Sequence, residues 1–183
     1  LLQRVLRNLL RSGIPIREMT AILESLGDNA LKTKNANTLT EIVRKSLSRT
    51  ITGQYKDPAR GILAITFEPS LEHQLTSTLR QENGELALGA PAETVVALNR
   101  RIAEAWRSVM DQGLDKAVLL CDARLRAPLA QMLSRTLPML PVVAYDEIVL
   151  GTPIEPIETV SIGPDGAAAM SGRESMAGIS AGS

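Results

Sequence analysis

The stretch that decides the fold is Ala117-Val118-Leu119-Leu120-Cys121, which is followed at once by Asp122. A continuous apolar run of this length is typical of a strand covered on both faces, as the strands of a parallel sheet are. Two further short runs flank it along the chain, a β-rich one over residues 62–67 and an apolar one over residues 142–145. The sequence therefore predicts three strands, with the one at 117–121 fully buried.

Helical patterns separate these strands. They cover residues 69–81, 91–110 and 125–137, and Pro128 is tolerated in the last of them only within its first turn. Strands that alternate with helices of this length predict a compact α/β unit with crossover connections and a short, mostly parallel sheet. Residues 86–88 add a weak strand, and residues 159–162 add an edge strand.

The first 54 residues carry apolar side chains at helical spacing in three stretches. Ser12-Gly13 ends the first predicted helix and Gly27 ends the second. A polar stretch, residues 32–37, reads as a loop, and Thr38 followed by Glu41 is a capping-box pattern that opens the third helix. A small helical subdomain is therefore predicted before the α/β part, and the fold class is α+β or α/β.

Turn and composition signals divide the chain into four parts. Residues 1–54 form the helical subdomain, and residues 55–61 form a connector that holds Asp57-Pro58 and Gly61. Residues 62–162 form the α/β subdomain. Residues 163–183 form a tail with fourteen Gly, Ala or Ser among 21 residues, which we expect to be flexible because it buries too little apolar surface to offset its ordering entropy.

The composition narrows the function classes. A chain of 183 residues is one domain or two small ones. Aromatic residues make up only 2%, so stacking platforms for single-stranded nucleic acid are scarce. The single cysteine allows no disulfide within one chain and fits a reducing compartment. No apolar run approaches the ~18 residues of a membrane span. Because the chain starts at Leu1 inside a helical pattern, we interpret it as a fragment.

Charge is distributed unevenly although the net charge is zero. Residues 1–60 hold eleven Lys or Arg against five Asp or Glu, and residues 61–162 hold eight against thirteen. This asymmetry suggests two modules that meet through complementary faces, within one chain or between neighbours. Arg44, Lys45 and Arg49 are the candidate protein-interface residues, because they lie opposite the apolar stripe of the third helix. The alternative is a solvated helix face whose charges contribute about 0–1 kcal/mol each.

Candidate catalytic residues lack partners in the sequence. His73 is the single histidine, and no orienting group or nucleophile accompanies it, so we interpret it as structural. Cys121 stands between a strand and a helix, where reactive thiols occur, but a buried apolar role fits it better. Asp146-Glu147 reads as a solvated turn. The sequence contains no group of His, Cys, Asp or Glu at the spacing of metal ligands, and no glycine-rich phosphate-binding loop. No catalytic, cofactor-binding or metal site is therefore predicted.

Two alternatives stay open at this point. The basic third helix, within a trihelical unit, is compatible with a helix-turn-helix-like DNA-binding regulator. Side chains that pair with base edges are not clustered at the helix start, which disfavours this reading. The α/β part is also compatible with a small enzyme of unknown reaction, which would need a cleft with convergent polar groups.

Seven collinear stretches resemble the FlhA family of flagellar and type III secretion export-gate proteins. The stretches are residues 2–10, 14–19, 22–26, 39–44, 69–72, 125–129 and 137–148. The last one is the most specific, and it reads Leu137-Pro138-Met139-Leu140-Pro141-Val142-Val143-Ala144-Tyr145-Asp146-Glu147-Ile148. Their order and spacing are similar to the last two cytoplasmic subdomains of that family.

The resemblance implies a non-catalytic docking and assembly module without a cofactor. The parent would be an integral protein of the bacterial inner membrane, with this part on the cytoplasmic face. Family members form nonameric rings below the export gate that receive export substrates, their chaperones and ATPase-complex proteins. The main chaperone groove of the family lies upstream of Leu1, so none of its residues is carried over, and the residues from 163 onward receive no family function.

Overall fold

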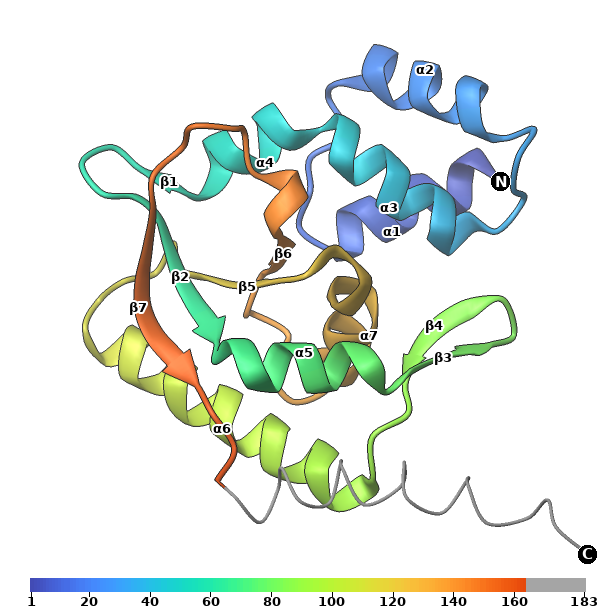
Figure 1. Cartoon of the computed structure of the whole chain (residues 1–183). Helices are drawn as coiled ribbons and strands as arrows, with labels where there is room; N and C mark the ends of the chain where they lie inside the picture. The colour runs from blue at the N-terminus through green and yellow to red at the C-terminus, as the bar shows by residue number, and fades with distance from the viewer. Residues whose placement is uncertain (164–183) are drawn as a thin grey trace, which may run out of the picture.

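The computed structural model describes residues 1–163. Its first part consists of α1 (Leu2–Arg11), α2 (Met19–Asn29), α3 (Ala36–Ser46) and α4 (Ser48–Tyr55). Helix α3 packs against both α1 and α2 (Figure 1). Apart from Gly163, the tail predicted to be flexible lies outside the described residues.

Two helix boundaries in this part differ from the prediction. Helix α2 continues past Gly27 to Asn29, and α3 begins at Ala36 rather than after Thr38. Asn35 caps α3, because its side-chain oxygen accepts from the backbone N–H groups of Asn37 and Thr38. The capping-box interpretation was therefore wrong.

The main sheet has the order β7–β2–β5–β6, and all neighbouring pairs along it are parallel. Its strands are β2 (Gly61–Phe67), β5 (Val118–Cys121), β6 (Val142–Ala144) and β7 (Ile154–Val160), with a two-residue strand β1 (Lys56–Asp57) antiparallel to β2. The three predicted strands are confirmed, and so is the fold class of helices followed by a mixed, mostly parallel sheet.

Strand β7 extends well beyond the predicted edge strand. It pairs along β2 from Ile154 to Val160, whereas the sequence indicated only residues 159–162. Pro156 and two glutamates interrupt the apolar pattern there, and a proline is tolerated because β7 is an edge strand. Gly61 allows the close contact: its φ is +85°, and a Cβ at this position would stand 2.3 Å from the carbonyl oxygen of Pro153.

The remaining elements connect the strands of the main sheet. They are α5 (Pro69–Ser77), β3 (Leu79–Glu82), β4 (Glu85–Leu88), α6 (Ala92–Asp111), α7 (Ala123–Leu133) and the 3-10 turn η1 (Tyr145–Glu147). Helix α5 ends before the predicted Gln81, because β3 pairs with β4 in a hairpin. At its tip, Asn83 and Gly84 both have positive φ, as a tight hairpin turn requires.

Helix α7 departs from the prediction at both ends. It starts two residues earlier than predicted, after Asp122, whose side chain accepts from the backbone N–H of Arg124. It ends at Leu133, four residues before the predicted end at Leu137. Pro128 lies inside the helix and not in its first turn, so its predicted position in the first turn was wrong.

The two faces of the sheet belong to two apolar clusters. Leu63, Leu119 and Cys121 pack with residues of α5, α6 and α7, while Ala64 and Leu120 pack with residues of α1, α3 and α4. This alternation follows from the two-residue period of a strand. The molecule thus has three layers, a helical layer over residues 2–55, the sheet, and the layer of α5–α7 (Figure 1). The predicted subdomain boundaries stay a prediction.

Candidate protein-interaction site

Three side chains of α3 pair with residues of opposite charge in the part of the chain that follows the helical layer. The pairs are Glu41–Arg126, Arg44–Glu147 and Lys45–Asp146. Arg126 belongs to α7, and the two acidic partners belong to η1. Two of these pairs, Arg44–Glu147 and Lys45–Asp146, place the base on the helical part and the acid on the following part, whereas Glu41–Arg126 has the opposite polarity.

The Arg44–Glu147 pair is withdrawn from solvent, with side chains 1% and 3% exposed. Arg44 donates from Nε to Oε1 of Glu147 at 2.5 Å and from Nη2 to Oε2 at 2.9 Å. Backbone groups of β6 complete the site: the N–H of Ala144 donates to Oε2 at 2.9 Å, and the carbonyl of Val142 accepts from Nη2 at 3.3 Å. A two-pronged contact of this kind fixes the orientation of both groups.

The charge state of Arg44 follows from this environment. Burial by itself lowers the pKa of Arg44, but the hydrogen bonds and negative charge of Glu147 outweigh it, so the pKa of Arg44 is raised above its ordinary value. Burial also raises the pKa of nearby Tyr55, against the opposing effect of the Arg44 charge. The guanidinium therefore stays charged inside the protein, with Glu147 as its counterion.

The other two pairs are more accessible. Arg126 is 7% exposed, and its Nη2 donates to Glu41, which is 31% exposed, at 2.5 Å. Lys45 Nζ lies 3.2 Å from Asp146, with the two side chains 66% and 38% exposed. An exposed pair of this kind contributes about 0–1 kcal/mol, so Arg44–Glu147 dominates the contact between α3 and η1.

The structure corrects the predicted position of Arg44. We predicted that Arg44, Lys45 and Arg49 lie on one exposed side of the third helix, but Arg44 is buried and Arg49 belongs to α4. Helix α3 is covered by α1 and α2 and also by η1, so a residue outside its apolar stripe is still enclosed. Glu147 is likewise buried, not part of a solvated turn. Lys45 and Arg49 are exposed, and their role in an interface stays a prediction.

The N-terminus of α3 is also fixed to the layer of α5–α7, by the β3–β4 hairpin. The capping residue Asn35 donates from Nδ2 to the carbonyl oxygen of Gly84 at 3.3 Å. Asn37 donates to Glu85 at 2.5 Å and accepts from Asn8 of α1 at 2.8 Å. Polar contacts thus connect helix α3 to the rest of the chain at its start, middle and end.

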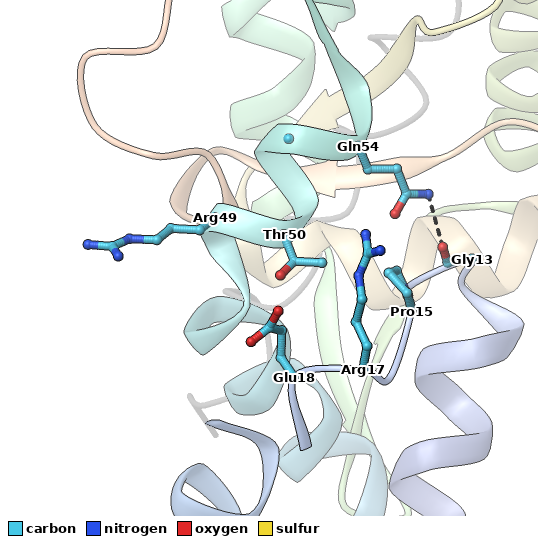
Figure 2. A pocket seen from close by; sticks show the side chains of 8 residues that line it. Gly13, Pro15, Arg17, Glu18, Arg49, Thr50 and Gln54 are labelled. Carbon is cyan, nitrogen blue, oxygen red and sulfur yellow. Dashed lines mark hydrogen bonds between the residues drawn. The ribbon is translucent and has the colours of Figure 1, made fainter. Parts of the chain in front are cut away.

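A shallow groove lies between the α1–α2 connection and α4. It is lined by Gly13, Pro15, Arg17, Glu18, Arg49, Thr50, Gly53 and Gln54. In Figure 2, Arg17 runs along the groove beside Pro15, and Arg49 points away from it. Gln54 donates to the carbonyl oxygen of Gly13 at 3.0 Å. The lining offers exposed charge of both signs and no paired nucleophile and base.

The candidate catalytic residues are not brought together. Cys121 is fully buried, and burial raises the pKa of its thiol well above the ordinary value, while His73 is exposed on α5. At the carboxyl end of β5, the backbone N–H of Asp122 donates to the carboxylate of Glu72 at 2.7 Å. In α/β proteins this end of a strand commonly binds ligands, and here a side chain of the same chain occupies it.

Two other kinds of site have no candidate in the described part of the chain. Residues 1–163 contain no group of three or more His, Cys, Asp or Glu placed to hold a metal ion. None of the helices among these residues has both the length and the apolar character needed to cross a bilayer.

Sequence comparison finds one family. The FHIPEP family matches residues 1–152. The chain is 35% identical over 147 residues to the flagellar biosynthesis protein FlhA of Proteus mirabilis, covering 80% of this chain and 20% of that protein. It is 28% identical over 162 residues to FlhA of Bacillus subtilis, covering 88% of this chain and 24% of that protein. The chain thus spans about a fifth to a quarter of these relatives.

Solved structures share the fold. The C-terminal domain of InvA superposes with a TM-score of 0.75 at 24% identity, covering 85% of this chain and 47% of that one. The MxiA protein of Shigella flexneri gives 0.74 at 26% identity, covering 87% and 51%. The nonameric SctV-C assembly of EPEC gives 0.71 at 23% identity, covering 85% and 46%.

Proposed function

Because this chain belongs to the FHIPEP family, we propose that it is a distal, cytoplasmic part of a type III protein export gate, where it serves as a non-catalytic docking and assembly module. The match of the family over residues 1–152 carries this proposal. The parent protein would be integral to the bacterial inner membrane, with this part on the cytoplasmic face.

The described residues support a rigid binding module. Helix α3 is fixed to the hairpin, α7 and η1 by charged and polar contacts, so the helical layer presents its outer surface in a fixed orientation. Rigid surfaces lose less conformational entropy when they bind a partner. The DNA-binding alternative is weakened, since Arg44 and Lys45 already pair with acidic residues of this chain.

The partners we propose are copies of the parent protein in a ring, export chaperone–substrate complexes and components of the ATPase complex. Two related structures support self-association and the binding of a partner protein: one relative is a nonamer, and the CdsV protein of Chlamydia pneumoniae was solved in complex with CdsO. Lys45 and Arg49 are the exposed candidates for such contacts on the basic part of the chain.

A deletion experiment in the native host tests the proposal. Removal of the segment that corresponds to residues 1–163 should abolish secretion of export substrates, and a plasmid copy of the intact gene should restore it. The abundance of the truncated protein in the membrane fraction is the control, because loss of the whole protein would imitate loss of this segment. Normal secretion by a truncated protein that accumulates normally would refute the proposed function.

A further inference from the structure

The β3–β4 hairpin is a sheet of its own, which contains two strands within residues 1–163. It packs through β4 against α7, and its tip contacts α3 through Asn35 and Asn37. The hairpin projects from one side of the molecule, away from the main sheet (Figure 1). Strand β3 is therefore an edge strand, and residues 80–82 of it are exposed.

The register of the hairpin determines which backbone groups of β3 point outward. The N–H of Gly89 donates to the carbonyl oxygen of Thr78 at 3.0 Å, one residue before β3 begins. Hydrogen-bonded and non-hydrogen-bonded pairs alternate along an antiparallel ladder. The N–H and C=O groups of Leu79 and Gln81 therefore point away from β4. Among residues 1–163, the N–H of Gln81 has no hydrogen-bond acceptor.

One face of the hairpin is apolar. Leu79 and Leu88 lie opposite each other on this face and pack against the larger apolar cluster. Closer to the tip, Gln81 lies opposite Leu86, whose side chain is 38% exposed. A strand placed beside β3 would therefore find apolar surface on this face.

The other face of β3 carries one charge of each sign. Arg80 and Glu82 are exposed, and within residues 1–163 neither forms an ion pair. A Cβ on Gly89 would stand 2.7 Å from Nε of Arg80, so the glycine leaves room for the arginine to lie along the hairpin. Opposite charges on neighbouring strands stabilise their pairing. A strand beside β3 is therefore matched by an acidic residue near Arg80 and a basic one near Glu82.

The length and the charges of β3 limit what can pair with it. Proteins prevent indiscriminate pairing of edge strands by keeping them short and by placing charged residues on them. Strand β3 has four residues, and two of them are charged. Its outward backbone groups are therefore suited to a short extended segment of matching charge, and unsuited to open-ended aggregation.

We propose that an extended segment of an export substrate adds to β3 as a third strand of this hairpin. This inference rests on the proposed function and deepens it by naming the surface and the backbone conformation in which a substrate binds. Main-chain hydrogen bonds to Leu79 and Gln81 supply the affinity, and side chains on the two faces supply the selectivity. The segment has an apolar residue on the face of Leu86 and an acidic residue beside Arg80.

A proline substitution tests the added strand. Gln81→Pro removes the outward N–H and keeps the hydrogen bonds between β3 and β4, because proline is tolerated where the N–H of an edge strand faces solvent. The full-length protein in lipid nanodiscs is titrated with overlapping fluorescent peptides that cover one export substrate of the same host. Gln81→Pro should weaken binding of the best peptide about tenfold, whereas Gln81→Ala, which keeps the N–H, should stay within about threefold of the parent.

Three results would overturn the proposal. The first is that no peptide binds to the parent protein. The second is equal affinity of the parent and Gln81→Pro. The third is an equal loss of affinity in Gln81→Ala and Gln81→Pro, since it would assign binding to the side chain and not to the backbone.

Hydrogen exchange of the unsubstituted protein provides a second measurement, which holds even if Gln81→Pro lowers the melting temperature. The amide of Gln81 should exchange more slowly when the peptide is bound. The amide of Arg80 is the control within the same strand, because it already belongs to the ladder with β4 and should change little. Protection of the β7 edge without protection of Gln81 would place the added strand elsewhere and refute the proposal.

Secretion by the same strains separates the two hypotheses. Unchanged peptide binding and unchanged secretion in Gln81→Pro refute this inference alone. Secretion that persists without residues 1–163 refutes the proposed function.

Discussion

Removal of the Glu147 carboxylate is the sharpest test of how the helical layer is held. Glu147→Ala deletes the acceptor of two hydrogen bonds from Arg44 and one from the backbone of Ala144. The guanidinium would stay enclosed, with the carbonyl of Val142 as its remaining acceptor. Loss of one partner from a buried ion pair costs about 3–5 kcal/mol, because a charge is left without compensation.

This loss should be visible by thermal unfolding. For a chain of this size, 1 kcal/mol shifts the melting temperature by about 2–4 °C, so we expect a decrease of about 6–20 °C. Asp146→Ala is the matched control: it removes the neighbouring carboxylate of an exposed pair and should cost no more than about 1 kcal/mol. Equal melting temperatures for the two variants would refute our account of η1 as the anchor of α3.

A double variant separates loss of the pair from creation of an unpaired charge. Arg44→Met combined with Glu147→Leu removes both charges and keeps apolar volume, so it should be much more stable than Glu147→Ala. Arg44→Met and Glu147→Leu made singly complete a double-mutant cycle with this variant. The interaction free energy from the cycle should lie in the range of about 0.5–3 kcal/mol that is measured for residues in direct contact. If the double variant is the least stable of all, the pair itself, and not its desolvation, holds the layers together.

Four further outcomes are expected. Cys121 should react with a small thiol reagent far more slowly than a cysteine introduced at exposed His73, because the thiol must first become accessible; rapid labelling under native conditions would reopen the enzyme alternative. Gly61→Ala should destabilise the chain by about 1–3 kcal/mol in denaturant titrations, since the new Cβ would meet Pro153 and the residue would be strained. Arg49→Glu should reduce assembly or export at an unchanged melting temperature if this residue is an interface contact. The chain alone should bind chaperone–substrate complexes more weakly than a longer cytoplasmic part that carries the upstream groove, and equal affinity measured by calorimetry would show that the groove lies here.

Local pattern was sufficient for most secondary structure. The strand at residues 117–121 was recognisable because an uninterrupted apolar run of this length suits a strand covered on both faces. The strand at residues 62–67 was recognisable because its run is rich in residues that favour strands. The helices of residues 1–54 were recognisable from their apolar spacing. Strand β7 was largely missed, because its glutamates and Pro156 are allowed only by its place at the sheet edge, which no local pattern reveals.

The sequence by itself determined the fold class, the buried strand at 117–121 and the family, since each depends on residues that are close together or collinear along the chain. Only the tertiary structure determined which charged side chains are buried and with which residues they pair. Arg44 and Glu147 are 103 positions apart, and the wheel of an isolated helix places Arg44 in solvent. Burial of this arginine depends on a second layer that covers α3 from outside its apolar stripe, and a buried charge is stable only where such a layer brings its counterion within hydrogen-bonding distance.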